Sequence, residues 1–497
     1  MAQSTTERPP GTGPAEEPRG RPLARSGPGT EAGALRLLAL RLHFYAGVLV
    51  GPFLVVAALS GLVYAVSPTI ENVVDHHSLA SASADQRVPL ATQIRTATER
   101  HPDLTMSGVI PGANGANTRV LFADASLPST SYQRVVFVDP SDGSVPDDTV
   151  QYGSTGALPL RTWIDEVHRR LHLGDAGRLY AELAASWLAP ITLGGLLLWW
   201  DRSRRTRRRD EVSAPRPAAS ARASRGRPLL MRRHAVLGTW IALGLFVLAA
   251  TGLTWSTYAG GRVSDLRKAM QWSTPALTAK PVTSATSTGA DEHAGHDMTR
   301  PAGDVGAAAL PDQAAPVLAA ARQAGLSGPV QMTPPVAAGA PWLIKETRHS
   351  WTAGPNAVSI DPTSSAVVQR LDFATWPLAA KLTDWGIRIH MGFLFGLPNQ
   401  LLLAGLAGAL LVMIARGYRM WWLRRPGSRF GRPPARGALR ELARRRPVAT
   451  VLGGALLIAV GWAIPLLGIS LLGFLLVDSL IGLVTRRTAA THSTAGG

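Results

Sequence analysis

Four histidines at matching depths of long apolar runs are the residues in this chain best suited to chemistry. His43 and His234 each open an apolar run on its arginine-rich side, and His172 and His390 each precede an apolar run on the opposite side. Neutral imidazole binds haem iron strongly, and two axial histidines give a low-spin electron carrier without an open coordination site. The pattern predicts two b-type haems, one near each face of a bilayer, held by His43 with His234 and by His172 with His390.

Membrane helices are the elements that must position these histidines. A helical span needs about 20 apolar residues, and the sequence contains five apolar runs, near 44–66, 179–200, 235–258, 391–415 and 448–484. The first four runs each fit one span. The fifth is 37 residues long with Pro465 near its middle, so we interpret it as a hairpin of two short spans, which gives six spans in all.

The basic residues indicate which way the spans run. Of the 51 Lys and Arg residues, 31 lie between the spans or at the ends of the chain, in 1–42, 201–233, 415–447 and 485–497. An excess of Lys and Arg marks cytoplasmic loops. We therefore expect a multi-pass protein of the cytoplasmic membrane with both termini inside and two long polar segments outside. No RNA-binding motif accompanies the arginines, so the net charge of +18 does not indicate nucleic-acid binding.

The chain repeats itself in two halves. Aligned without gaps, the first and third spans match His43 with His234, Ser60-Gly61-Leu62 with Thr251-Gly252-Leu253, and Tyr64 with Trp255; His172-Leu-Gly174 matches His390-Met-Gly392 before the second and fourth spans. Parallel repeats of this kind are related by an axis along the membrane normal. Matched histidines are then expected at equal depth, facing each other across that axis.

The outer segments repeat as well. VVFVDPSDGSV at 135–145 and AVSIDPTSSAV at 357–367 each read as a strand, an Asp-Pro turn and a second apolar stretch, which predicts a hairpin. Helical patterns precede them near 90–101 and 311–324. Each outer segment is therefore expected to be a small α+β unit.

The predicted fold is an α-helical integral membrane protein: a pseudo-symmetric four-helix bundle with a C-terminal helical hairpin and two small extracytoplasmic α+β domains. In order, the segments are a disordered cytoplasmic N-terminus (1–34), first span (35–67), outer domain (68–160), second span with its outer extension (161–200), basic cytoplasmic loop (201–232), third span (233–258), outer domain (259–380), fourth span (381–422), basic cytoplasmic loop (423–447), hairpin (448–485) and cytoplasmic tail (486–497).

The sequence resembles the PepSY-associated transmembrane family, which includes iron-regulated membrane proteins and ferric-siderophore reductases. The resemblance covers about 35–425 and rests on RLHFYAGVLVGPF, FVDPSDG, HRRLHLGDAG, DWGIRIHMGFLFG and the Trp-Trp helix ends. It implies that the two Asp-Pro hairpins are PepSY units. It also implies electron transfer across the membrane to an extracytoplasmic acceptor, a ferric siderophore or other metal chelate.

Three further residues lie beside the expected outer site. His168 comes four residues before His172, on the same face if the helix is continuous, and Gly386 takes its place in the second half. It could replace His172, join a third site or hydrogen-bond a haem propionate. Arg170 and Arg388 match in the repeat and could pair with propionates or be simple interfacial charges.

Two acidic residues in the apolar runs have no evident role. Glu182 lies near the outer start of the second span and Asp478 in the last run; acidic residues inside a membrane are costly and often functional. Glu182 is expected to pair with an arginine or carry a proton, unless it lies in the headgroup region. The sequence offers Asp478 no partner.

A second metal site is suggested by DEHAGHDM in the second outer segment. His293, His296, Asp297 and Met298 are plausible ligands for copper, zinc or iron,, although a solvated linker is the favoured interpretation of this Ala/Gly/Thr-rich stretch. The chain has no cysteine, which excludes disulfides and thiolate-bound metals or clusters.

The electron donor is expected to be another component. No nicotinamide, flavin or nucleotide fingerprint occurs, so electrons must come from a separate cytoplasmic flavoprotein or from membrane quinol. Two other classes stay open: a non-enzymatic PepSY module that binds or inhibits a peptidase or senses a signal, and an accessory to copper or iron transport. The spans are nearly free of polar residues at mid-depth, which disfavours a transporter.

Overall fold

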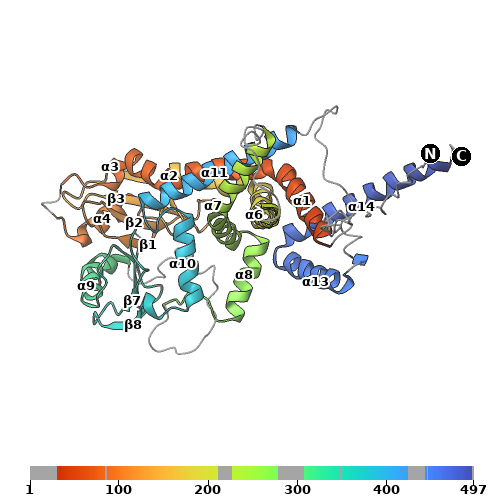
Figure 1. The fold of residues 1–497 in the computed structure, drawn as a ribbon. Coiled ribbons are helices and arrows are strands. Elements are labelled where there is room, and N and C mark those ends of the chain that lie inside the picture. Colours follow the sequence, from red (N-terminus) through yellow and green to blue (C-terminus); the bar gives the residue numbers. More distant parts are fainter. Residues whose placement is uncertain are drawn as a thin grey trace, which may run out of the picture.

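The computed structural model describes residues 31–83, 87–210, 226–277, 307–347, 350–423, 443–444 and 446–494. A β-sheet body lies at one end of the molecule, a helical bundle in the middle, and the C-terminal helices at the other end (Figure 1). The long helices run between the sheet body and the opposite end, as the sequence predicts for spans that carry their outer domains on one side.

Within the described residues, four helices are long and apolar enough to cross a membrane. These stretches are Gly51–Val74, Gly174–Arg207, Arg227–Thr254 and Leu397–Trp422, and they lie in helices α2 (Gly51–Val74), α6 (Gly174–Asp210), α7 (Arg227–Thr254) and α11 (Leu397–Trp422). They coincide with the first four apolar runs, so the prediction of an integral membrane protein is confirmed. Helix α1 (Glu31–Leu49) leads directly into α2 and carries His43.

The bundle packs with the two-fold pattern of the repeat. Helix α2 packs on α11, and α6 packs on α7, so the first span contacts the fourth and the second contacts the third. Helix α7 also packs on α11, and glycines permit that contact: a Cβ on Gly244 would lie 2.7 Å from the Leu406 side chain, and one on Gly238 would lie 2.9 Å from that of Met413. Small residues at helix interfaces are the usual means of close packing in membranes.

The second and fourth spans are each preceded by a separate short helix. Helix α5 (Pro159–Arg170) precedes α6, and α10 (Leu378–His390) precedes α11. The expected continuous segments 161–200 and 381–422 are thus broken by turns. Helix α8 (Tyr258–Ala269) follows α7, and α3 (His76–Leu79) follows α2.

The two outer segments share one eight-stranded antiparallel sheet, where the sequence analysis expected two separate domains. The spatial order is β4-β3-β2-β1-β5-β6-β7-β8, and Val109 pairs with Met332 where β1 meets β5. The strands are β1 (Thr105–Ile110), β2 (Thr118–Ala123), β3 (Tyr132–Val138), β4 (Asp147–Tyr152), β5 (Val330–Thr333), β6 (Trp342–Glu346), β7 (Ala357–Ile360) and β8 (Val367–Leu371). Joining the halves removes one exposed edge from each four-stranded unit.

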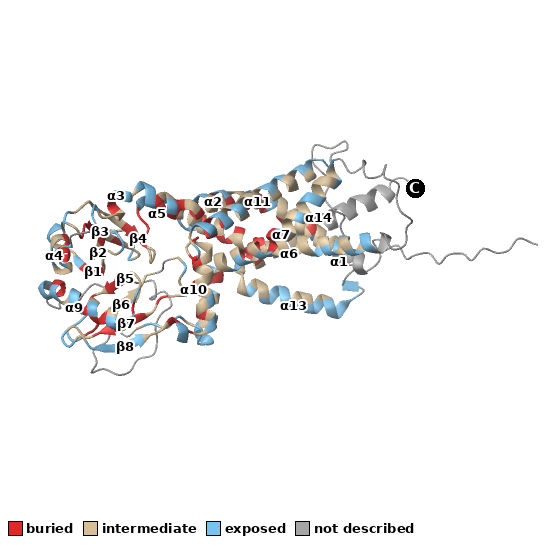
Figure 2. Cartoon of the chain, turned by 60° about the vertical axis from the view of Figure 1, so that its left-hand side comes forward, coloured by how far each residue is buried: buried red, intermediate tan, exposed pale blue. Residues whose placement is uncertain are grey.

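The sheet body has one hydrophobic core. Helices α4 (Leu90–Arg100) and α9 (Leu310–Gln323) contact each other and cover one face of the sheet, and the buried core beneath them draws on both halves (Figure 2). The predicted Asp-Pro hairpins are formed by β3 with β4 and by β7 with β8. Two 3-10 turns complete the outer part, Ala307–Ala309 and Phe373–Thr375.

The C-terminal apolar run forms two helices that meet at Ile464. They are α13 (Pro447–Ala463) and α14 (Pro465–Thr494), so the break lies where Pro465 predicts it. A Cβ on Gly468 would lie 2.6 Å from the Cα of Gly461, which shows how closely the two helices approach. Their apolar stretches are shorter than those of the four long helices. The sequence analysis counted these two helices as the fifth and sixth spans, and that count stays a prediction.

Candidate functional site

The inner histidine pair joins helices α1 and α7. His43 on α1 and His234 on α7 place their ring centroids 6.3 Å apart, with the ring planes at 79°. Helix α6 lies between their helices, packed on α1 on one side and on α7 on the other. The structure thus brings together two residues that the repeat relates by sequence alone.

A backbone carbonyl of the following long helix holds each inner ring. His43 Nδ1 lies 3.0 Å from the carbonyl oxygen of Ile191 on α6, and His234 Nδ1 lies 3.2 Å from that of Met413 on α11. A carbonyl oxygen only accepts, so Nδ1 is the protonated nitrogen of both rings. This tautomer leaves the lone pair of each Nε2 available to a metal.

The outer pair is His168 with His390, not His172 with His390. The ring centroids of His168 and His390 lie 6.4 Å apart, with the planes at 44°. Both residues come from the short helices α5 and α10 that precede the second and fourth long helices. In the structure His168, and not His172, faces His390, while the ligand roles of these histidines stay predictions.

The end of helix α5 explains this replacement. The helix stops at Arg170, and Leu171 and His172 both adopt the left-handed conformation with φ of 53°. His168 and His172 therefore do not share a helical face. The His172 ring is exposed and lies against Trp163, with its centroid 5.3 Å from that of the indole. Helix α10, by contrast, continues as far as His390.

Side-chain hydroxyls hold the outer rings. His168 Nδ1 lies 2.9 Å from Ser60 Oγ, and His390 Nδ1 lies 2.7 Å from Thr251 Oγ1. Each hydroxyl donates its single proton to the carbonyl four residues earlier in its own helix, at 2.8 and 2.7 Å. In the tautomer that leaves Nε2 free for a metal, Nδ1 carries the ring proton and the hydroxyl oxygen accepts it while donating to the carbonyl.

Repeat-matched aromatic residues flank the outer rings. Tyr64 stacks on His168, with centroids 5.9 Å apart and planes at 10°, and Trp255 packs edge-on against His390 at 5.7 Å. The sequence alignment already matched Tyr64 with Trp255, and Ser60 with Thr251. That correspondence is the signal that could have assigned them to the site, but it does not say which residues contact a histidine.

Glycines make room for two of the rings. A Cβ on Gly61 would lie 3.0 Å from His168 Cε1, and a Cβ on Gly195 would lie 3.1 Å from His43 Cε1. Both separations are tighter than side chains normally tolerate. One ring of the outer pair and one of the inner pair therefore rest directly on a helix backbone.

The ring separations suit two imidazoles bound to one metal ion. With metal–nitrogen bonds of about 2 Å and ring centroids about 1.1 Å beyond each nitrogen, the two centroids would lie about 6.2 Å apart. The observed values are 6.3 and 6.4 Å. Among the described residues, no group of three or more His, Cys, Asp or Glu could hold a metal ion. A metal ion held by either pair would take two ligands from it, which suits a metal whose remaining ligands come from a macrocycle.

The two pairs lie at equal spacing in both halves of the repeat. Ser60 follows His43 by 17 residues, and Thr251 follows His234 by 17 residues. At 1.5 Å per residue the inner and outer sites are about 26 Å apart along the helices. This is close to the roughly 30 Å thickness of a bilayer's hydrocarbon core.

Helix α5 is fixed to α2 by a buried ion pair that the sequence analysis did not single out. Arg161 Nη1 lies 3.2 Å from Glu71 Oε1, and the backbone N–H of Leu158 donates to the other carboxylate oxygen at 2.8 Å. Both charged side chains are buried. This contact holds α5 so that His168, two turns further along, faces Ser60.

The two arginines considered for propionates are engaged within the protein. Arg170 pairs with Glu166, and Arg388 lies 3.5 Å from Asp384, so each forms an i,i+4 pair on its short helix. Arg388 is only 2% exposed and also donates to the backbone carbonyl of Thr352. In the described structure these contacts tie α10 to the sheet body and give Arg388 a structural role.

Glu182 caps a helix. Its carboxylate accepts the backbone N–H groups of Thr257, Tyr258 and Ala259, at 2.9, 3.1 and 2.9 Å, where α8 begins. A negative charge at a helix N-terminus is stabilising, so Glu182 is satisfied by α8 where the sequence analysis expected an arginine or a proton-carrying role.

Asp478 has a partner that the sequence did not reveal. It pairs with Arg41, which is 4% exposed and lies two residues before His43. Next to this pair, Tyr45 contacts Phe474, with ring centroids 5.2 Å apart. Helix α14 is therefore attached to the helix that carries His43.

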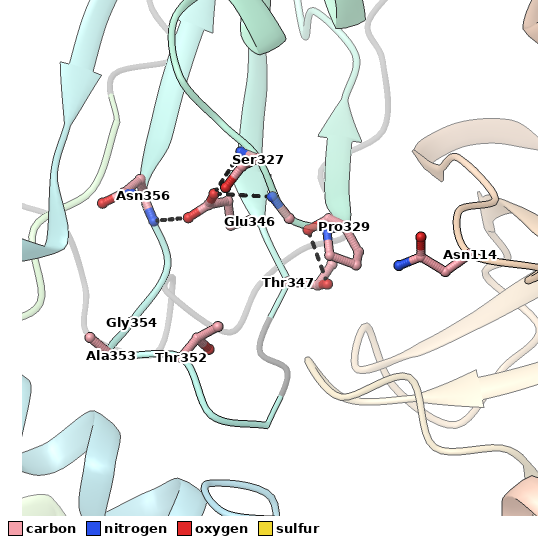
Figure 3. Close-up of a pocket in the computed structure, with 10 residues that line it drawn as sticks. Asn114, Ser327, Pro329, Glu346, Thr347, Thr352, Ala353, Gly354 and Asn356 are labelled. Carbon is pink, nitrogen blue, oxygen red and sulfur yellow. Dashed lines mark hydrogen bonds between the residues drawn. The ribbon is translucent and has the colours of Figure 1, made fainter.

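A cavity of about 480 Å³ lies in the sheet body, beside the residues that contact α10. Its wall includes Ser327, Glu346, Thr352, Ala353 and Asn356, and Figure 3 shows Asn114 of the first half facing it from the opposite side. The Glu346 carboxylate accepts the backbone N–H of Ser327 at 3.2 Å and that of Asn356 at 3.0 Å, as Figure 3 shows. The wall is thus polar and braced.

Helix α10 connects this cavity to the outer pair. Arg388 donates to the Thr352 carbonyl, and Trp385 Nε1 donates to the Ala353 carbonyl at 2.6 Å. His390 follows Arg388 by two residues, about 3 Å along the helix. A second hollow of about 380 Å³ shares Ala353 and is lined by Lys381.

The outer rings are neutral. Exclusion of water lowers the pKa of His168 to about 4, with a further contribution from the positive charge of Arg169, and it lowers the pKa of His390 to about 3, with a further contribution from His168. Helices α5 and α10 lie outside the four membrane-spanning helices. Their packing against α2 and α7 excludes water from both rings. A neutral imidazole is the form that binds a metal.

The expected second metal site, with His293, His296, Asp297 and Met298, lies outside the described residues.

Comparison with known families gives a match over most of the chain: the model of the PepSY-associated TM region matches residues 40–424. All four residues of the two pairs fall inside this range, and helices α13 and α14 fall outside it. No curated protein matches the sequence.

Proposed function

Because the chain belongs to the PepSY-associated transmembrane family, we propose that it is a di-haem b protein of the cytoplasmic membrane that carries electrons outward to an extracytoplasmic ferric chelate, such as a ferric siderophore. The observation that carries the proposal is the presence of two imidazole pairs, the inner one repeat-related, at ring separations of 6.3 and 6.4 Å. His43 with His234 would hold the inner haem and His168 with His390 the outer one.

The protein's own contribution is to present four neutral imidazoles through Nε2. Each Nδ1 is occupied by a carbonyl or a hydroxyl, and in the described part of the chain no hydrogen bond engages Nε2 of these rings. Bis-histidine haem supplies one-electron chemistry without an open coordination site. Substrate therefore has no place on the iron, and the acceptor must bind beside the outer site.

The cavity above α10 supports an acceptor site at this position. It opens among polar groups, with Asn356, Thr352 and backbone N–H groups in its wall, and its volume of about 480 Å³ lies within the range of small-molecule pockets. The neighbouring hollow adds the ammonium group of Lys381. Because the Glu346 carboxylate also lies in the cavity wall, an oxygen-rich ferric chelate of low net charge matches these groups better than a strongly anionic one.

The electron donor would be a separate cytoplasmic flavoprotein or membrane quinol. The sequence lacks a nucleotide- or flavin-binding fingerprint, and the inner pair lies at the arginine-rich ends of α1 and α7. Basic juxtamembrane segments favour anionic lipid and acidic partners, which agrees with both termini lying in the cytoplasm.

The decisive experiment uses the full chain purified in mild detergent from cells supplied with ample haem. Reduced-minus-oxidised absorption spectra should show low-spin b-type bands, and haem quantification should give about two haems per chain. The reduced protein should be reoxidised by a ferric chelate, with the ferrous iron trapped by a coloured chelator. A colourless protein would refute the proposal and favour a PepSY module that binds a peptide or another protein.

A further inference from the structure

The inner and outer histidines differ in the acceptor that each Nδ1–H meets. Both inner rings donate to backbone carbonyls, at 3.0 and 3.2 Å, whereas both outer rings donate to hydroxyl oxygens, at 2.9 and 2.7 Å. The distinction holds in both halves of the repeat, so it follows depth in the bundle.

The two kinds of acceptor differ in strength. A peptide carbonyl carries a larger partial negative charge on oxygen than an alcohol does, so at equal distance it draws the Nδ1 proton more strongly and leaves the ring richer in electrons. The outer bonds are shorter than the inner ones and oppose this difference, so the proposal requires that acceptor type outweigh acceptor distance. A more basic imidazole stabilises ferric iron, because hydrogen bonds in the second coordination sphere tune the ligand and hence the metal. Second-sphere hydrogen bonding is one of the means by which a protein sets a haem potential.

On these grounds we propose that the chain orders its two haem potentials through Ser60 and Thr251. The hydroxyls give the outer site the higher midpoint potential, and the carbonyls of Ile191 and Met413 give the inner site the lower one. The resulting exchange is the passage of one electron from the inner to the outer site, in which no bond forms or breaks and no proton moves. The inference rests on the proposed function and adds the residues that favour its outward direction.

Neighbouring charges do not provide the same distinction. Arg416 acts electrostatically on His234 at the inner site, and Arg169 acts on His168 at the outer site. One ligand of each pair thus has an arginine near it. The Nδ1 acceptor, by contrast, is a carbonyl for both inner histidines and a hydroxyl for both outer ones. Ser60 and Thr251 are therefore positioning residues for the outer ligands.

Redox titration of the purified holoprotein, followed by visible absorption, tests this order. Two midpoints are expected, and the single-site variants assign them: His390→Ala retains the inner haem and His43→Ala retains the outer one. The outer site should hold the electron with at least about a tenfold preference, which corresponds to 59 mV for a one-electron couple. An inner midpoint equal to or above the outer one overturns the inference.

Substitution of the hydroxyls gives the second test. Ser60→Ala and Thr251→Val remove the acceptors of His168 and His390 and should raise the outer midpoint further while leaving the inner one unchanged. Thr239→Val is the matched control. Thr239 lies on the same helix as Thr251, and its hydroxyl donates to the Ala235 carbonyl at 2.9 Å. An unchanged or lowered outer midpoint in both variants contradicts the inference.

A conservative variant keeps the test decisive if the outer haem is lost from either protein. Ser60→Cys preserves the shape of the side chain and replaces the hydroxyl by a weaker acceptor, so it should raise the outer midpoint and alter the low-spin ferric EPR signal of that haem alone. An outer midpoint that does not rise overturns the inference. Absence of haem from the unmodified protein refutes the proposed function itself, whereas two haems in the reverse order refute only this inference.

Discussion

The inner and outer histidine pairs each bring two imidazoles together, but their rings come from different helices of the repeat. The inner imidazoles come from the long helices α1 and α7 and are held by the backbones of α6 and α11. The outer imidazoles come from the short helices α5 and α10 and are held by side chains of α2 and α7. In every case the ring and the helix that holds it belong to the same half of the repeat. In the first half α6 holds His43 and α2 holds His168; in the second half α11 holds His234 and α7 holds His390.

The comparison teaches that a repeat can preserve a contact without preserving the residue that makes it. In the second half Gly386 occupies the position of His168, and a Cβ there would lie 3.0 Å from Thr251 Cγ2. The same hydroxyl is reached instead by His390, one helical turn later. The two outer ligands therefore differ by one turn along their helices and still form a pair.

The largest expected effect separates the two candidates for the outer site. His168→Ala and His390→Ala should each reduce the content from about two haems to about one per chain, because one axial ligand is lost. His172→Ala, at an exposed position four residues from His168, is the matched control and should retain both. Haem content and difference spectra decide the matter, and loss of the outer haem in His172→Ala alone would restore the pairing predicted from the repeat.

Glycine substitutions should affect the two sites separately. Gly61→Ala would press a methyl group against the His168 ring, and Gly195→Ala would press one against His43. Each should lower haem retention, or change the EPR signal, at its own site only. Gly47→Ala, where no atom lies within 4 Å of the added carbon, should leave both haems unchanged; equal effects from all three would show that the rings do not rest on these backbones.

The ion pair between Arg41 and Asp478 should matter more for the inner site than for the outer. Asp478→Asn removes the carboxylate charge that faces the buried Arg41, and breaking a buried pair costs about 3–5 kcal/mol, reduced here because Asp478 is 24% exposed. Thermal unfolding followed by the inner haem's absorption should shift to lower temperature. The double variant Arg41→Met/Asp478→Leu should recover most of the loss, and failure to recover would point to a role beyond packing.

The smallest expected effect concerns Glu182. Glu182→Gln weakens three hydrogen bonds to the start of α8, and charge-assisted bonds of this kind contribute about 1–3 kcal/mol. The melting temperature should fall by a few degrees while both haems and their potentials stay the same. A change in the pH dependence of electron transfer without a change in stability would indicate the proton-carrying role instead.

Several features could be read from the sequence because they are local or periodic. Four apolar runs of sufficient length predict the membrane helices, and Pro465 marks the break between α13 and α14. The Asp-Pro turns predict the β3–β4 and β7–β8 hairpins. His43 and His234 could be related to each other because both lie inside long helices, whose regular geometry carries a sequence match directly into a match in depth.

The rest was decided by tertiary structure. A helix end depends on the turn that follows it, so the left-handed conformation of Leu171 and His172, which turns His172 outward and leaves His168 facing Ser60, could not be read from the spacing of the histidines. The partners of Asp478 and Glu182 lie far away along the chain, and so does the pairing of Val109 with Met332 that joins the outer segments into one sheet. Sequence determined which residues were available at each depth; packing of α5 and α10 against the bundle decided which of them meet.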